Sequence, residues 1–217
     1  MKIEFHDDPI EQTTSATDVL MALLAAGLAF YLSPALAGTR PYKAGLWLAI
    51  LGLVTASSAL GAVAHGFKMS PKVNRGIWQP INLLLGLTIA LFAAGASLDL
   101  WGESAARGLL PYFLLAGGIF FLVTVFIPGT FLVFIVYEAL AMLFALIVYT
   151  ALALGRTLPG AWWMAAGVLV MMIAAAIQTR KNIRFTAIWQ FDYNGAFHFI
   201  QMAGIALLGI GLAQALF

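Results

Sequence analysis

Two histidines, His65 and His198, lie within long apolar stretches of the chain. Imidazole nitrogens together with a carboxylate are ligands that zinc prefers. Asp192 precedes His198 by six residues, and it could bind a metal, orient a histidine or act as a general base. A catalytic zinc ion lowers the pKa of a bound water toward about 7 and yields a hydroxide that attacks carbonyl groups. These residues predict metal-dependent hydrolysis at a site built from two distant segments.

Asp18 and Ser58 are further candidates for catalytic roles beside Asp192. Ser58 and His65 are seven residues apart, which is two helical turns, and Gly61 lies between them on the same helix face. The alternative for both residues is structural. A serine commonly bonds backbone between membrane helices, and the run S-A-T-D that ends at Asp18 offers N-cap chemistry.

The stretch F-D-Y-N-G-A-F-H-F-I-Q places polar residues where an apolar segment begins. Asn194, His198 and Gln201 are spaced four and three apart, so they share one helix face. Polar groups inside a bilayer are costly and usually face one another in the bundle interior. Glu138, in the middle of its segment, could instead hydrogen-bond a neighbouring helix. Besides the candidate ligands and catalytic residues, the residues expected to line this polar pocket are Glu11, Gln79, Asn82, Glu138, Asn194 and Gln201.

The composition indicates which kind of scaffold holds these residues. Hydrophobic residues make up 63% of the chain and charged residues 9%, against about 25% charged residues in a soluble domain. The chain is therefore predicted to be an integral membrane protein. It has no cysteine, which excludes disulfides, thiolate catalysis and cysteine-based metal sites. A net charge of +2 does not favour nucleic acid as a partner.

Seven segments are long and apolar enough to span a bilayer, which takes about 20 residues. Turns rich in Pro, Gly and charged residues separate them, and no internal repeat is evident. The predicted segments are Thr14–Ala37, Tyr42–Phe67, Arg75–Leu98, Gly108–Ile127, Thr130–Leu154, Pro159–Thr179 and Asn194–Phe217. We therefore expect one all-α domain over residues 1–217, a seven-transmembrane helix bundle that follows a short polar segment at residues 1–13.

Lysine and arginine in the loops predict the orientation of the bundle, because cytoplasmic loops are enriched in both. The side that holds the N-terminus carries Lys2, Lys68, Lys72, Arg75, Arg180, Lys181 and Arg184. The opposite side carries Arg40, Lys43, Arg107 and Arg156. We expect the N-terminus inside and the C-terminus outside, in a multi-pass protein of the inner membrane if the cell is bacterial.

Three stretches match elements of a known superfamily. E-Q-T-T-S-A-T-D resembles its acidic helix-one element, S-S-A-L-G-A-V-A-H-G-F its helix-two element with a serine and a histidine, and F-D-Y-N-G-A-F-H-F-I-Q its helix-seven element. On these residues the chain resembles the CREST superfamily of alkaline ceramidases, adiponectin-type receptors and related membrane hydrolases. The resemblance implies seven helices, zinc near the cytoplasmic side and hydrolysis of lipid amides.

The chain departs from the superfamily pattern at several positions. The serine that stands four residues before the helix-two histidine is Gly61 here. Asn194 replaces the first of two helix-seven histidines, and Gln79 and Asn82 occupy the region of the helix-three aspartate.

The resemblance thus leaves His65 and His198 as zinc ligands, and His6, Asp18 or Asp192 could supply a third. The expected function is zinc-dependent hydrolysis of the amide or ester bond of a membrane lipid. A lipid-binding or receptor-like protein that has lost its metal is one alternative. A small-solute transporter that uses Glu138 is another.

Overall fold

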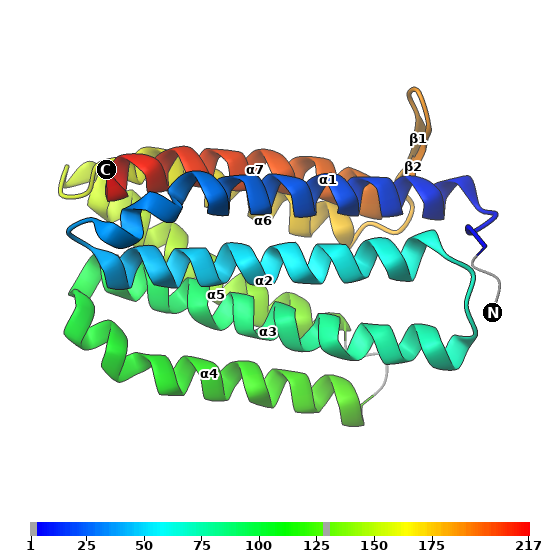
Figure 1. Cartoon of the computed structure of the whole chain (residues 1–217), viewed down its shortest axis with the longest axis horizontal. Helices are drawn as coiled ribbons and strands as arrows, with labels where there is room; N and C mark the ends of the chain where they lie inside the picture. Colours follow the sequence, from blue (N-terminus) through cyan, green and yellow to red (C-terminus); the bar gives the residue numbers. More distant parts are fainter. Residues whose placement is uncertain (1–3, 128–130) are drawn as a thin grey trace.

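The computed structural model describes residues 4–127 and 131–217, without the side chains of residues 131 and 132. Seven long helices run side by side along one axis (Figure 1). They are α1 (Pro9–Leu32) with a short 3₁₀ continuation η1 (Ser33–Ala37), α2 (Pro41–Gly66), α3 (Pro71–Trp101), α4 (Glu103–Phe126), α5 (Phe131–Leu154), α6 (Ala161–Gln178) and α7 (Tyr193–Leu216). Within the described residues, these seven helices are long and apolar enough to cross a membrane.

The first helix begins five residues earlier than the sequence pattern predicts. Asp8 is its N-cap, with the carboxylate accepting a hydrogen bond of 2.9 Å from the backbone N–H of Ile10, and Pro9 occupies the first helical position. Asp18 is therefore a buried residue inside α1, and the proposal that it caps this helix is wrong.

The third and fourth helices are also longer than predicted. Gly102 alone separates them, and its φ of 84° is a conformation that glycine adopts without strain. Arg107 and Glu103 form an ion pair of 2.8 Å on the first turn of α4, a spacing that supports a helix. Asp99 and Glu103, which lie between the predicted segments Arg75–Leu98 and Gly108–Ile127, are both helical. Lys2 and the turn at residues 128–130, which entered the predicted topology, lie outside the described residues.

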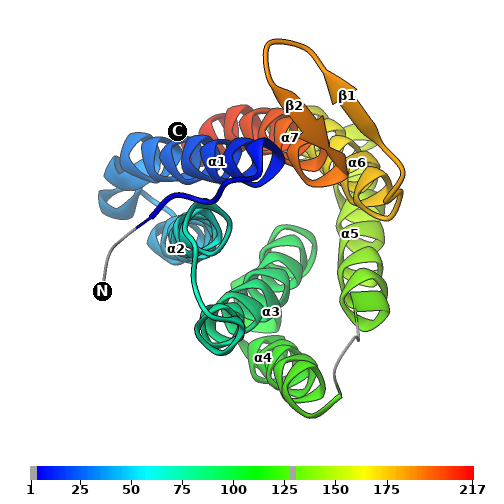
Figure 2. The same cartoon turned by 90° about the vertical axis from the view of Figure 1, so that its right-hand side faces the viewer.

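Six of the helices pack into a closed ring in the order α1, α2, α3, α5, α6, α7, as the view along the bundle shows (Figure 2). The fourth helix packs mainly on the outside of α3. The closest approach is between α6 and α7. A Cβ atom added at Gly204 would lie 2.9 Å from the carbonyl oxygen of Gly167, so the two backbones are in direct contact.

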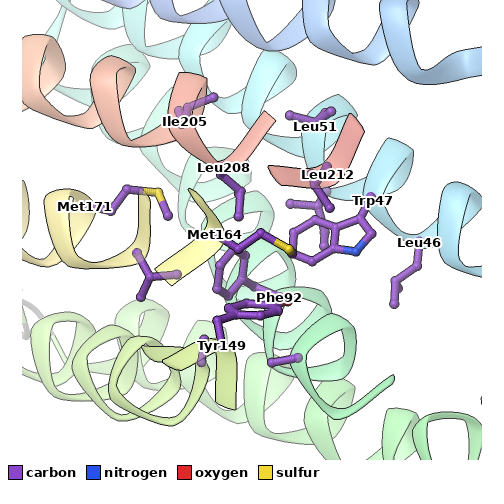
Figure 3. Close-up of a cluster of buried hydrophobic side chains, with 14 of the residues drawn as sticks. Leu46, Trp47, Leu51, Phe92, Tyr149, Met164, Met171, Ile205, Leu208 and Leu212 are labelled. Atoms are coloured by element: carbon purple, nitrogen blue, oxygen red, sulfur yellow. The ribbon is translucent and has the colours of Figure 1, made fainter. Parts of the chain in front are cut away.

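A cluster of buried apolar side chains extends from the middle of the bundle toward the end at which α7 stops, and Figure 3 shows part of it. Trp47 and Phe92 pack edge to face, with 5.3 Å between ring centroids, and Tyr149 and Met164 are completely buried beside them. Each of these residues lies in the half of its helix that is closer to the end where α7 stops. The candidate polar residues lie in the other half, nearer the N-terminus.

A β-hairpin, which the sequence analysis did not predict, joins α6 to α7. Its strands β1 (Arg184–Thr186) and β2 (Gln190–Asp192) pair antiparallel, with Arg184 opposite Asp192. The hairpin projects sideways from the N-terminal end of the bundle (Figure 1). Phe191 is buried at its base and stacks on Phe185, with 5.1 Å between ring centroids. The hairpin therefore fixes where α7 begins.

Candidate functional site

Polar side chains from α1, α2 and α7 meet at the N-terminal end of the bundle. Asp192 ends the hairpin and caps α7, because its Oδ1 accepts hydrogen bonds from the backbone N–H groups of Asn194 (2.9 Å) and Gly195 (3.1 Å). This cap sets the start of α7, whose second turn carries the buried His198. The structure thus gives Asp192, a predicted metal ligand and base, a capping role.

His198 is held by a threonine of α1. Its Nδ1 lies 2.8 Å from Oγ1 of Thr17, and that hydroxyl in turn donates to the carbonyl oxygen of Thr14 at 2.8 Å. A hydroxyl has one proton, and the bond to Thr14 uses it, which favours Nδ1 of His198 as the donor to Thr17. With a proton on Nδ1, the neutral form of His198 carries its lone pair on Nε2.

Asp18 faces that lone pair. Its Oδ1 lies 3.5 Å from Nε2 of His198, and the two side chains are 6% and 9% exposed. On its other side the Asp18 carboxylate rests against α2, where a Cβ atom added at Gly61 would lie 2.9 Å from Oδ2. Two acceptors in a buried pocket face each other, so a proton or a cation must lie between them.

His65 belongs to a second histidine–carboxylate pair beside the first. Its Nδ1 lies 2.6 Å from Oε2 of Glu11, and its ring packs edge-on against Trp78, with 5.6 Å between centroids. The carboxylate orients the imidazole, an arrangement that is common around metal-binding histidines. His65 is close enough to interact electrostatically with Asp18 and His198. Asp18 also lies against Gly61, one turn from His65 on α2.

The segment before α1 is tied to the linker between α2 and α3, next to His65. The backbone N–H of Lys68 donates to the carbonyl of Glu4 at 2.9 Å, and Phe5 stacks on Phe67. The side chain of Lys68 lies 2.8 Å from Asp7, and this hydrogen bond raises the pKa of the lysine above its ordinary value. His6 uses Nδ1 to accept the N–H of Asp8 at 3.2 Å, so this nitrogen is already occupied in the N-terminal turn.

The remaining predicted site residues lie on four helices, some close to the two histidines in sequence and others on helices that carry neither histidine. Ser58 is buried on α2, two turns from His65. Gln201 lies one turn from His198 on α7, and its buried Oε1 has no hydrogen-bond partner among the described residues; the same holds for Gln79 on α3. Two of the predicted residues, Asn82 on α3 and Asn194 in the first turn of α7, are half-buried. Glu138 lines a separate cavity between α5 and α6.

Sequence reasoning missed Thr17 as a functional residue. The available signal was the run T-T-S-A-T-D, in which Thr14, Thr17 and Asp18 are three and four residues apart and so share a helix face. That signal has meaning only if the helix has already begun before Thr14. The predicted start of α1 at Thr14 placed the run at a helix end and concealed the shared face.

The pair His198–Asp18 fits two positions of a zinc site. Zinc binds imidazole nitrogen and carboxylate oxygen at about 2.0–2.2 Å, so two such atoms on a tetrahedral ion lie about 3.4 Å apart. The 3.5 Å between Nε2 and Oδ1 matches that spacing. Over residues 4–127 and 131–217, however, no group of three His, Asp or Glu side chains is close enough together to hold a metal ion. A third ligand would have to move in, and His65 lies one turn along α2 from Gly61, which Asp18 contacts.

Comparison with known proteins assigns a family but no activity. Neither the curated proteins nor the solved structures gave a match. Residues 13–216 match the sequence model of a family described as "Family of unknown function (DUF6962)". The matched region contains Asp18, His65 and His198, whereas Glu11 precedes it. Because the match covers nearly the whole chain, this protein belongs to the DUF6962 family.

Proposed function

We propose that this protein is a zinc-dependent integral-membrane hydrolase that cleaves the amide or ester bond of a membrane lipid. The observation that carries the proposal is the buried pair of acceptors, Nε2 of His198 and Oδ1 of Asp18, at the spacing of two zinc ligands. The resemblance to the CREST superfamily supports the same chemistry. In the proposed orientation the site faces the cytoplasmic leaflet, and the C-terminus lies outside.

Each residue of the site has a role in this proposal. His198 and Asp18 bind the zinc ion, and Thr17 holds His198 in the tautomer that offers Nε2. His65 supplies the third ligand through Nε2, while Glu11 accepts the proton on Nδ1 and keeps the ring oriented. Bound zinc would supply a Lewis acid for the acyl carbonyl of the lipid.

Gln201 is the residue that would contact the substrate. Its buried Oε1 is an acceptor without a partner among the described residues, which is costly unless a donor arrives. An amide N–H or a hydroxyl of a lipid headgroup would supply that donor. The bilayer delivers such a substrate laterally, with its acyl chains remaining in the apolar phase.

The first test is the metal content of detergent-purified protein that has been supplied with zinc throughout, measured by mass spectrometry. The expected result is one zinc ion per chain in the wild type and none in His198→Ala or Asp18→Asn. Glu138→Gln is the matched control, because this buried carboxyl lies outside the site and its loss leaves zinc bound. Folded wild-type protein without zinc, or zinc retained in both site variants, would overturn the proposal.

The second test is hydrolysis. Ceramides and lysophospholipids are incubated with the purified protein, and released fatty acid is measured before and after chelation of zinc. We expect release that zinc restores after chelation, and no release by His198→Ala.

A second candidate function is lipid binding without catalysis. The observation that favours it is that no three metal-binding side chains converge in the described part of the chain. In that case His198 and Asp18 share a proton, and the two pairs form a hydrogen-bonding wall. Binding of a ceramide that survives chelation, with no fatty acid released, would distinguish this function from hydrolysis.

A further inference from the structure

A cavity of about 290 Å³ lies along the contact between α5 and α6, apart from the histidine site. Its lining comes from matching positions on the two helices, each set spaced three, four and seven residues apart. These residues are Ile135, Glu138, Ala139 and Met142 on α5, and Met172, Ala175, Ala176 and Thr179 on α6 with the residue that follows it. Because the helices run antiparallel, Ile135 lies toward Thr179 and Met142 lies toward Met172.

Among the described residues, Glu138 is the only ionisable one that lines this cavity. Its side chain is 8% exposed, and within the described residues its carboxyl group has neither a hydrogen-bond donor nor a cation beside it. The hydroxyl of Thr179, the other polar side chain of the lining, donates to the carbonyl of Ala176 at 2.7 Å. The buried Asp99 in the same bundle, by contrast, has both a lysine and a tyrosine as partners.

A carboxyl group in such surroundings is neutral while it keeps its proton, and it becomes a carboxylate when a positively charged partner enters beside it. Calcium and magnesium do not fit, because they require about six or more oxygen ligands and the lining offers one carboxyl and one hydroxyl. An ammonium group is satisfied by fewer acceptors, and the rest of the lining is alanine, isoleucine and methionine. The cavity therefore suits an organic cation with an apolar body.

The lining also sets the direction and size of such a ligand. Thr179 marks the end of α6, whereas Met142 and Met172 lie deeper in the bundle. Glu138 lies about 10 Å from the start of α5. The charged end of a ligand would lie there, with its tail against the two flexible methionines. Sites for small molecules usually measure roughly 300–1,000 Å³, so this cavity has room for a single alkyl chain.

We infer that the cavity between α5 and α6 binds an amphipathic primary amine with one alkyl chain, whose ammonium group pairs with the Glu138 carboxylate while its chain lies along Met142 and Met172. This inference does not depend on zinc or on hydrolysis. It assigns Glu138 to a binding site of its own, separate from the polar residues with which sequence reasoning had grouped it.

The test is protection of Glu138 from an apolar carboxyl reagent, in protein reconstituted into lipid nanodiscs. A carboxylic acid adds across one N=C bond of dicyclohexylcarbodiimide, and the acyl group then migrates to nitrogen, so the product keeps all atoms of both partners. The labelled peptide is found by mass spectrometry. We expect labelling of Glu138, at least about tenfold slower labelling with saturating decylamine, and no protection by decanol, which has the same chain without the charge.

The chain provides its own controls. Asp99 is equally buried but paired with Lys43, so it is expected to stay unlabelled. In Glu138→Gln, native mass spectrometry is expected to find no decylamine adduct, whereas the wild type retains one. Folded wild-type protein that is not labelled at Glu138, or that decanol protects as well as decylamine does, would overturn the inference. The zinc content of Glu138→Gln reports separately on the histidine site.

Discussion

Lys43 of α2 and Asp99 of α3 form a buried ion pair, with 2.5 Å between Nζ and Oδ1 and side chains that are 5% and 4% exposed. The hydroxyl of Tyr149 on α5 donates to the other carboxylate oxygen of Asp99 at 3.3 Å. The helices α2, α3 and α5 are thus joined at the end of the bundle opposite the histidines. Both charges are compensated within the protein, so this cluster has a structural role.

Removing one partner of this ion pair is predicted to destabilise the bundle by about 3–5 kcal/mol, because the other charge is left buried without compensation. Asp99→Asn and Lys43→Met each test this in thermal unfolding of the detergent-solubilised protein. The double variant should recover much of the loss, since no isolated charge remains. Additive losses in the double variant would show that the two residues do not act as a pair.

Gly61→Ala is predicted to displace Asp18, because the added Cβ would lie 2.9 Å from the carboxylate. The expected result is loss of bound zinc with helix content unchanged, measured by metal analysis and circular dichroism. Gly52→Ala on the same helix is the matched control, since a Cβ there meets no atom within 4 Å. Full zinc content in Gly61→Ala would contradict the role of Asp18 as a ligand.

Thr17→Val is predicted to weaken zinc binding by roughly 10–100-fold, because Nδ1 of His198 loses the acceptor that holds its tautomer. Thr17→Ser should restore the affinity, since it keeps the hydroxyl. Competition with a zinc-binding dye measures both. Thr88→Val serves as the control, because the hydroxyl of Thr88 bonds only the backbone of α3. Equal affinities in the Thr17 and Thr88 valine variants would remove Thr17 from the site.

Gly204→Val is predicted to destabilise the contact between α6 and α7 by at least about 1–3 kcal/mol, the usual cost of overpacking. Its Cβ would lie 2.9 Å from the carbonyl oxygen of Gly167, and a backbone atom cannot move aside as a side chain does. A Cβ added at Gly27 on α1 meets no atom within 4 Å, so Gly27→Val should change the unfolding temperature little. Similar unfolding temperatures for the two variants would contradict close packing between these helices.

The sequence was sufficient for the number and approximate limits of the helices, since hydrophobicity and Pro or Gly punctuation are properties of consecutive residues. It also placed the two histidines toward the same end of the bundle. Errors arose where a local signal had two meanings. S-A-T-D reads equally well as a cap or as the polar face of a helix under way, and G-E-S-A-A-R-G reads as a loop although the structure places only Gly102 between α3 and α4.

The partners of the polar residues were decided by the tertiary structure alone. Asp18 rather than Asp192 faces His198, His65 pairs with Glu11, and Glu138 lines a cavity of its own. These pairings depend on how each helix is rotated about its axis and which helices are neighbours in the ring. The position of a residue along a helix fixes the direction of its side chain only relative to that helix, and it does not fix how the helix is rotated in the bundle. Which helices are neighbours follows from the packing of all seven. The polar residues of the site were therefore readable in the sequence, but their pairing required the assembled bundle.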